Sequence, residues 1–284
     1  MEKQYCIVTG ANAGIGKEIT AGLMAKGAHV VMACRNMDAC SVAQQELHQR
    51  QLPGTCQCSR LDLADLQSVR SFAKQQQQEL QSSKQPLRVL VNNAGVMGVG
   101  PGPGGADQHL AVNHFGPFLL TNLLLPCMEP GSRIVNVASR AHYWGRLAVK
   151  DGCVVPGWSN WFPQYAQSKL CNVLFTAELQ RRLQGRGIIA TSVSPGFVNT
   201  TIFRSLPPWL GSLATALAPS IARTPAEGAE VAVYAATSSE LSAERPVPLF
   251  LHDCKATPPA KLAEDKQLAA DLWAASAAAV GWKQ

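Results

Sequence analysis

The sequence predicts an α/β protein: a single doubly wound domain in which helices flank a seven-stranded parallel sheet. Short apolar runs alternate with longer helix-like segments along the 284 residues, which is the pattern of repeated βαβ units. A glycine-rich turn follows the first apolar run, as in phosphate-binding strand–turn–helix units. A chain that is 46% hydrophobic and 15% charged can bury one sizeable core, so we expect one domain over residues 1–284.

The expected strands are continuous apolar runs, typical of parallel strands buried on both faces. They are residues 5–8, 29–34, 55–61, 87–91, 133–137, 188–193 and 247–251. Helix-like segments separate them, the first over residues 17–26. A glutamine tract at residues 75–78 falls on one of these helices, on a face that we expect to be exposed and without function.

The glycine-rich turn at residues 9–16 reads T-G-A-N-A-G-I-G. Gly10, Gly14 and Gly16 have no side chain, so the backbone can turn sharply and approach a pyrophosphate at the N-terminus of the next helix. The spacing differs from the G-x-G-x-x-G of the commonest dinucleotide fingerprint. Its place directly after the first strand still predicts a bound dinucleotide.

The end of the second expected strand indicates which dinucleotide is preferred. An acidic residue there would bind the ribose hydroxyls of NAD, but the strand ends Cys34-Arg35-Asn36. The Arg35 guanidinium suits a 2′-phosphate, and Asn12 could add a donor, so we expect NADPH to be preferred over NADH. Asp38 is close enough in sequence to keep NAD as the alternative.

Tyr165 and Lys169 are four residues apart and would share one face of a helix. A free tyrosine hydroxyl has a pKa of roughly 10, so it accepts protons poorly at neutral pH unless a fixed positive charge stabilises the phenolate. Lys169 can supply that charge. The pair therefore predicts acid–base chemistry, although the same spacing also occurs by chance on exposed helices.

Charge and cysteine content narrow the classes of partner and site. The net charge of +6 is modest, and the sequence contains no run of Lys or Arg. We therefore expect no nucleic-acid binding, while binding of an anionic cofactor or of an acidic membrane surface remains compatible with this charge. The nine cysteines are scattered and lack a C-x-x-C pair, so they indicate neither a metal site nor a disulfide framework. We expect a reducing intracellular compartment, cytoplasmic or at an organelle membrane, and no targeting segment before the first strand.

Several motifs, in their order and spacing over nearly the whole chain, resemble the short-chain dehydrogenase/reductase family. They are T-G-A-N-A-G-I-G, Asn92-Asn93-Ala94-Gly95, Ser139, Tyr165-x-x-x-Lys169 and Pro195-Gly196. Others resemble its retinol dehydrogenase-like branch and chloroplast-envelope reductases: Ala33-Cys34-Arg35, residues 61–64, 112–116 and 168–175. The separation of Ser139 from Tyr165 (165 − 139 = 26) matches an insertion in this branch, here residues 142–163. The resemblance implies a Rossmann fold and an NADP-dependent oxidoreductase.

The resemblance also implies catalytic roles. Tyr165 would be the acid/base toward a carbonyl or alcohol oxygen, and Lys169 would lower its pKa and bind the nicotinamide ribose. Ser139 would hydrogen-bond the same substrate oxygen. Asn113 would link Lys169 to solvent through an ordered water; the alternative is an amide satisfied by neighbouring backbone.

The cofactor contacts that the resemblance implies fall in short segments along the chain. They are Gly10, Asn12, Ala13, Gly14, Ile15 and Gly16 at the pyrophosphate, Arg35, Asn36, Asp62 and Leu63 at the adenosine end, Asn93, Ala94, Gly95, Tyr165 and Lys169 at the ribose, and Pro195, Gly196, Val198 and Thr200 at the nicotinamide. Ala13 stands where relatives commonly have Ser, so one hydrogen bond is missing. Asp62 could instead cap the following helix.

Apolar segments near the expected site indicate a hydrophobic substrate, such as a retinoid-like, steroid-like or lipid aldehyde or ketone. Residues 197–226 would form a lid, and the insertion adds Trp144, Trp158, Trp161 and Phe162. These aromatic residues could equally be packing or an interaction surface. We therefore keep an alternative, a cofactor-sensing protein that acts through a protein partner. Peripheral membrane contact and a homodimer or tetramer are further expectations, and the Gly/Pro-rich residues 98–105 have no assigned role.

Overall fold

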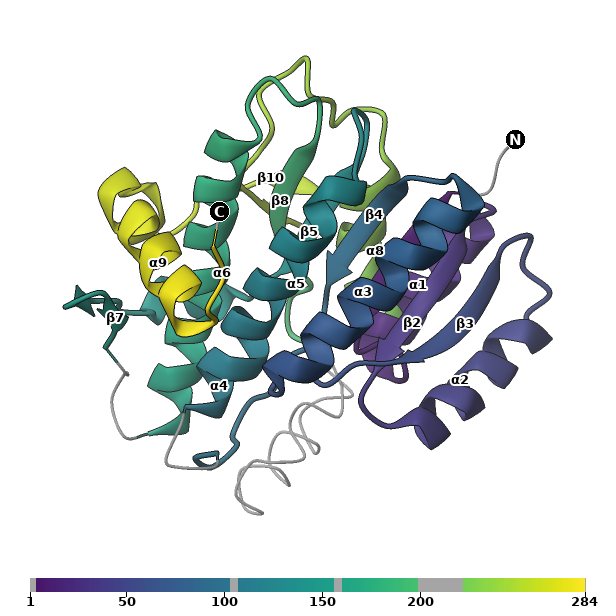
Figure 1. Ribbon diagram of the computed structural model, residues 1–284, viewed down its shortest axis with the longest axis horizontal. Helices are drawn as coiled ribbons and strands as arrows, with labels where there is room; N and C mark the ends of the chain where they lie inside the picture. The colour runs from purple at the N-terminus through teal and green to yellow at the C-terminus, as the bar shows by residue number, and fades with distance from the viewer. Residues whose placement is uncertain (1–3, 103–106, 156–159, 199–221, 284) are drawn as a thin grey trace.

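A twisted central sheet runs through the protein (Figure 1). The computed structural model describes residues 4–102, 107–155, 160–198 and 222–283. The strand order is β10-β9-β8-β5-β4-β1-β2-β3. The strands are β1 (Tyr5–Thr9), β2 (His29–Cys34), β3 (Thr55–Arg60), β4 (Leu87–Asn92), β5 (Arg133–Val137), β8 (Ile189–Ser194), β9 (Phe250–His252) and β10 (Lys255–Ala256).

The predicted doubly wound sheet is confirmed. All neighbouring strands from β3 to β9 pair in parallel, and each lies at a run predicted from the sequence. The prediction missed the antiparallel edge strand β10, because two residues are too short to show a periodic pattern. It also missed a small hairpin in the insertion, formed by β6 (Val149–Lys150) and β7 (Cys153–Val154).

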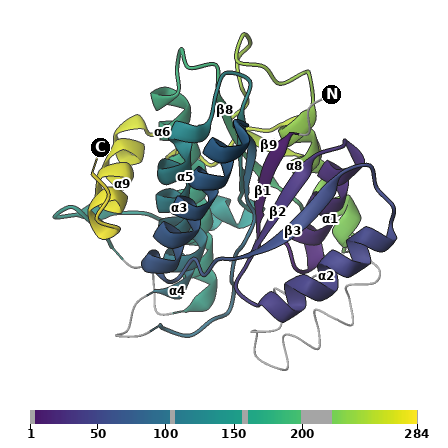
Figure 2. The same cartoon turned by 45° about the vertical axis from the view of Figure 1, so that its right-hand side comes forward.

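Helices cover both faces of the sheet (Figure 2). One face carries α1 (Gly14–Ala25), α2 (Met37–Gln49) and α8 (Pro225–Thr237), and the other carries α3 (Leu66–Ser83), α5 (Gly116–Leu124) and α6 (Trp161–Arg182). The C-terminal α9 (Lys266–Ala279) packs on α6. Alternate residues of β1 belong to the two cores, Cys6 and Val8 to one and Tyr5 and Ile7 to the other, because successive strand side chains point to opposite faces.

A helical run connects β4 to β5 through the core. It begins with α4 (Gln108–Leu110), continues as the π-helix Ala111–Phe115 and then as α5. Residues Gln108–Cys127 are long and apolar enough to span a membrane, yet most of this stretch is buried within the protein. Burial of this kind is ordinary for the core helix of a globular domain.

The expected exposed face of the glutamine tract is wrong at Gln76. Its side chain is 0% exposed and accepts a hydrogen bond of 3.0 Å from the Tyr5 hydroxyl. Gln76 shares a helix face with Val69, Phe72 and Leu80, all buried, because residues three and four apart on a helix point the same way. Because α3 packs on the sheet, four consecutive residues of it cover more than one turn and one of them faces the core.

The structure contains a disulfide, which the scattered cysteines did not indicate. Cys40 of α2 and Cys58 of β3 are joined by a disulfide, with Cα atoms 6.0 Å apart. They are 18 residues apart in sequence, so no local cysteine motif indicates the bond. The packing of α2 against β3 brings them together. The other cysteines, seven in number, are free thiols.

Candidate active site

A cleft of about 430 Å³ lies at the carboxyl ends of the parallel strands. The segments directly after β1, β2, β3, β4, β5 and β8 all contribute to its wall, as expected for ligand sites of open α/β sheets. Its predicted lining residues are Gly10, Asn12, Ala13, Gly14, Ile15, Gly16, Arg35, Asn36, Asp62, Leu63, Asn93, Ala94, Gly95, Tyr165, Lys169 and Pro195. The sequence did not reveal the apolar residues between them: Ala33, Leu61, Val96, Met97, Val112, Val137 and Ala138.

The glycine turn is built so that no side chain fills it. Gly10 and Gly14 have φ angles of +65° and +53°, which only glycine adopts without strain. A Cβ on Gly16 would lie 2.5 Å from Asn93 Nδ2 and closer still to the Gly10 carbonyl oxygen. The helix α1 begins at Gly14, and Ala13 provides no side-chain cap. Its first N–H groups therefore suit an anionic group, so these residues fit the pyrophosphate of a dinucleotide.

Thr9 and Asn93 attach this turn to β4. The Thr9 hydroxyl accepts hydrogen bonds from the backbone N–H groups of Asn93 and Ala94, both at 3.0 Å. In return Asn93 Nδ2 donates to the Thr9 carbonyl at 2.8 Å. These bonds hold the cleft wall in place, and the role of Thr9 was not predicted, since a threonine that ends a strand gives no distinctive sequence signal.

The adenosine end of the cleft contains one exposed cation. Arg35 and Asn36 line it directly after β2, and Arg35 is exposed. Asp38, the residue that kept NAD as an alternative, is exposed on α2 and lies outside the cleft lining. The Asp62 carboxylate accepts a hydrogen bond from the N–H of Ala64, and the cap of α3 is Asp65. The alternative reading of Asp62 as the helix cap is therefore wrong.

Tyr165 and Lys169 lie on α6 at the opposite end of the cleft. The Lys169 Nζ atom is 5.6 Å from the centroid of the Tyr165 ring and donates a hydrogen bond of 3.0 Å to the Val137 carbonyl. Burial raises the pKa of Tyr165 to about 12, while a hydrogen bond with the Ser139 side chain acts in the opposite direction. Burial also lowers the pKa of Lys169 to about 8. Ser139 follows β5 and caps the short helix Arg140–Trp144.

Asn113 lies in the π-helix and its amide is bonded within the protein. Its Oδ1 accepts from the Val96 N–H at 2.8 Å, and its Nδ2 donates to the Val96 carbonyl and to Ser168 Oγ. These contacts match the backbone-satisfied alternative. A Cβ on Gly95 would lie 3.3 Å from both Asn113 Oδ1 and Lys169 Nζ, so the two polar atoms border the same small space, and the water relay stays a prediction.

Two predicted nicotinamide contacts, Gly196 and Val198, are described and do not line the cleft. Gly196 packs beside the Arg223 side chain, and Val198 is buried beside Gly228. Thr200 lies outside the described residues, as does most of the predicted lid over 197–226. The last residues of that range belong to α8, which begins at Pro225, and the lid stays a prediction.

The aromatic residues of the insertion were expected either to bind a hydrophobic substrate or to serve as packing or an interaction surface. The structure places the described ones in different surroundings. Trp161 packs against Met97, Ala141 and Tyr165. Trp144, in contrast, is 64% exposed and contacts the ring of Phe162, which is also exposed. Trp158 lies outside the described residues.

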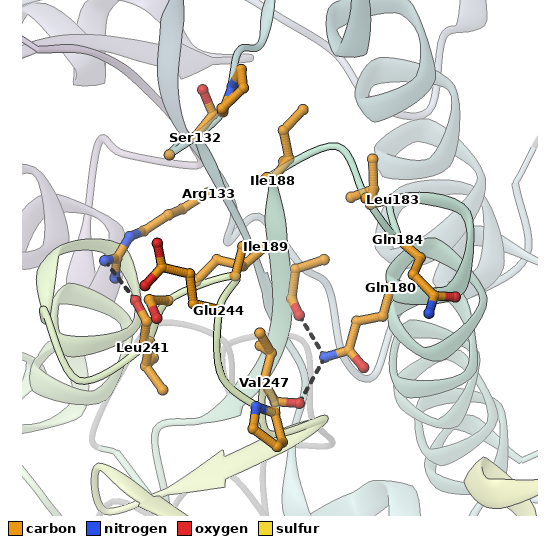
Figure 3. A pocket seen from close by; sticks show the side chains of 18 of the residues that line it. Ser132, Arg133, Gln180, Leu183, Gln184, Ile188, Ile189, Leu241, Glu244 and Val247 are labelled. Carbon is orange, nitrogen blue, oxygen red and sulfur yellow. Dashed lines mark hydrogen bonds between the residues drawn. The ribbon is translucent and has the colours of Figure 1, made fainter.

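A larger cavity, of about 920 Å³, lies at the amino ends of β5 and β8 (Figure 3). Two of its polar side chains, those of Arg133 and Gln180, are bonded within the fold. Arg133 donates hydrogen bonds to the carbonyls of Ala235, Ser238 and Leu241, and Gln180 donates to the Ala190 carbonyl. The residues that line the smaller cleft together with Tyr165 follow the carboxyl ends of the strands, opposite to the larger cavity. The smaller cleft is therefore the candidate active site.

Comparison with known proteins agrees with this site. Residues 4–211 match the family model described as short chain dehydrogenase. The chain is 40% identical to the human "Dehydrogenase/reductase SDR family member 13", over 95% of this chain and 71% of that protein. It is 36% identical to the human "Retinol dehydrogenase 13", over 97% of this chain and 84% of that protein.

A solved structure from Beutenbergia cavernae has the same fold. It is described as a putative NAD(P) dependent gluconate 5-dehydrogenase with bound NADP, and it superposes with a TM-score of 0.68 at 27% identity, over 88% of this chain and 94% of the other. The sheet, the glycine turn and these similarities lead to one conclusion. The chain belongs to the short-chain dehydrogenase/reductase family of oxidoreductases, in its retinol dehydrogenase-like branch.

Proposed function

We propose that this protein is an NADP(H)-dependent oxidoreductase that interconverts a hydrophobic carbonyl compound and its alcohol. One observation carries the proposal: Tyr165 and Lys169 line the same cleft as the glycine-rich turn and Arg35. A cleft with those two ends can hold a dinucleotide and a reacting oxygen together. The matching family supports the oxidoreductase class.

The chain's own residues supply binding, orientation and proton transfer. When bound, the dinucleotide supplies the two-electron redox chemistry. Tyr165 donates its phenol proton to the substrate oxygen during carbonyl reduction and accepts a proton from the alcohol during oxidation. Ser139 hydrogen-bonds the same oxygen and holds it in line. Lys169 places a positive charge beside the phenol and so stabilises its ionised form.

The preference for NADP(H) rests on Arg35. Its guanidinium is the exposed cation at the adenosine end, and a planar guanidinium suits bidentate binding of a phosphate. The Asp38 carboxylate that could favour NAD lies outside the cleft. The related bacterial structure with bound NADP supports the same choice.

The substrate class rests on the cleft wall near Tyr165. Met97 lines the cleft beside Tyr165 and packs in an apolar cluster with Ala141, Trp161 and the Tyr165 ring, and apolar walls select apolar ligands. The name of the related human retinol dehydrogenase supports a retinoid-like compound within this class.

The test is NADPH and NADH oxidation by the purified protein over a panel of hydrophobic aldehydes and ketones, with Tyr165→Phe in parallel. The phenylalanine keeps the ring but removes the transferred proton, so we expect turnover to fall at least about 100-fold with little change in the dissociation constant for NADPH. Unchanged turnover would remove Tyr165 from the mechanism. Tight NADPH binding with no turnover of any compound would favour the cofactor-sensing alternative.

A further inference from the structure

A buried acid–base pair lies behind Tyr165 and is not used by the proposed mechanism. Asp107 and His109 stand at the start of α4, and their side chains are 8% and 1% exposed. The His109 Nδ1 atom is 3.4 Å from Asp107 Oδ1. Buried charged or polar side chains are costly to a protein unless their partners compensate, so a pair placed here calls for an explanation.

The pair is incompletely bonded. Asp107 Oδ1 accepts the backbone N–H groups of His109 and Leu110. Asp107 Oδ2 and His109 Nε2 are buried and have no hydrogen-bond partner among the residues that the structure describes. Capping of α4 thus explains the contacts of one Asp107 carboxylate oxygen. It does not explain why an imidazole is buried beside it.

The imidazole lies against the candidate acid/base. The ring centroids of His109 and Tyr165 are 6.5 Å apart, with an interplanar angle of 71°, an edge-to-face arrangement that fixes ring orientation. Contact between α4 and α6 brings them together, and Figure 1 shows α4 beside the start of α6. The chain then enters the π-helix that carries Asn113, a distortion that is common at functional sites.

The Asp107 carboxylate acts electrostatically on a residue of α6, Cys171. Burial acts to raise the pKa of Asp107, but interactions with the His109 ring and with the N–H groups of Leu110 and His109 outweigh it and lower the pKa. Burial and then the Asp107 charge raise the pKa of the Cys171 thiol. Tyr165 and Cys171 are the titratable groups of α6 near the pair, and Lys169 lies one turn beyond Tyr165.

We propose that Asp107 and His109 are a positioning pair for Tyr165. His109 holds the phenol ring, and the Asp107 carboxylate behind it sets the pH range over which Tyr165 exchanges a proton with substrate. The inference rests on the proposed function, because it concerns the residue that transfers the proton.

The experiment compares wild type, Asp107→Asn and His109→Phe by the pH dependence of kcat for alcohol oxidation, in which Tyr165 must lose its proton. Asparagine is also a good helix cap, and phenylalanine keeps the ring contact. Removing the carboxylate eases ionisation of Tyr165 and moves the midpoint to lower pH. Removing the imidazole takes away the ring nitrogen that faces Asp107 Oδ1, so more of the carboxylate charge acts on the phenol and the midpoint moves to higher pH. We expect shifts of about 0.5 pH unit or more, with opposite signs.

His114→Phe is the matched control. His114 is a buried histidine on the same helical run, bonded to Ser276 and close to Phe115, Phe118 and Phe175. Burial lowers its pKa to about 3, so it is neutral over the range tested and its loss should leave the midpoint unchanged. A merely structural pair would lower the rate at every pH without moving the midpoint.

A readout independent of turnover is the pH dependence of unfolding. Because the folded-state pKa of Asp107 is lowered, its charge stabilises the fold above the ordinary carboxyl pKa, and this contribution is lost as pH falls through the folded value. The stability difference between wild type and Asp107→Asn should therefore shrink on acidification. NADPH dissociation constants should match in all variants.

The outcomes separate the two proposals. Absence of Tyr165-dependent turnover in wild type contradicts the proposed function. Wild-type turnover with identical midpoints in Asp107→Asn and His109→Phe, or with shifts of the same sign, overturns the positioning pair alone. If His109→Phe does not fold, His109→Gln provides the same comparison with a smaller, polar side chain.

Discussion

Burial governs the two ionisable side chains at the centre of the cleft. It raises the pKa of Tyr165 to about 12 and lowers that of Lys169 to about 8. Burial disfavours the charged form of each group, so ionisation of the phenol depends on the positive charge of Lys169 beside it. Any further charge close to Tyr165 has a large effect on such a buried group, which gives the Asp107–His109 pair its importance.

At the same scale, Arg35→Asp should reverse the dinucleotide preference. The substitution replaces a cation suited to a 2′-phosphate by a carboxylate that binds ribose hydroxyls. We expect the ratio of kcat/KM for NADPH over NADH to fall by roughly 10- to 100-fold, the worth of one or two charged hydrogen bonds. Arg186→Asp makes the same charge change at an exposed position outside the cleft lining and should leave the ratio unaltered. An equal response of both variants would show that Arg35 does not read the phosphate.

Among elements, the unit of β1, glycine turn and α1 depends on close backbone contact. Gly16 faces the Gly10 carbonyl and the Asn93 side chain, so there is no space for a methyl group. Thr9 and Asn93 lock the same turn to β4. The glycine turn is therefore held in place by neighbouring segments on both sides.

We expect Gly16→Ala to weaken NADPH binding and to lower the free energy of unfolding by about 1–3 kcal/mol, as overpacking does. Gly100→Ala is the control, because a Cβ there meets nothing within 4 Å and should change stability by less than about 0.5 kcal/mol. Fluorescence titration with NADPH and denaturant unfolding measure the two effects. Wild-type affinity in Gly16→Ala would mean that the turn does not hold the pyrophosphate.

A second element-scale prediction concerns the bond between α2 and β3. The Cys40–Cys58 disulfide closes a loop of 18 residues, for which the unfolded-chain entropy model gives about 3 kcal/mol of stabilisation. Reductant should lower the free energy of unfolding by about that amount in wild type and by nothing in the Cys40→Ala/Cys58→Ala double variant. Thiol titration of denatured protein should count the seven free cysteines before reduction and all nine after it. Nine thiols without reductant would contradict the bond.

Over the whole molecule, helix α6 is held from two sides. Its cleft side carries Tyr165 and Lys169, and its other side packs on α9 through an aromatic cluster. Trp273 contacts the rings of Phe118 and Phe175, and the Arg182 guanidinium lies 4.2 Å from the Trp273 ring centroid. The C-terminal helix thus supports the element that positions the acid/base.

Trp273→Ala should therefore lower the free energy of unfolding by about 3–5 kcal/mol, because a large buried side chain is lost and a cavity remains. Trp144→Ala removes the same side chain at a position that is 64% exposed and should cost less than about 0.5 kcal/mol. Denaturant unfolding monitored by circular dichroism compares them. Equal stabilities would show that α9 contributes little to the core.

The sequence by itself determined the sheet, the glycine turn, Arg35 and the Tyr165–Lys169 pair. Their signals are local: apolar runs, residues without side chains, and a spacing of four on one helix. Only the tertiary structure decided the burial of Gln76, the Cys40–Cys58 bond, the hydrogen bonds of Thr9 to Asn93, and the contact of His109 with Tyr165. Those features join segments far apart in the chain. Which distant side chains meet is set by how helices pack on the sheet, and no spacing within the sequence records it.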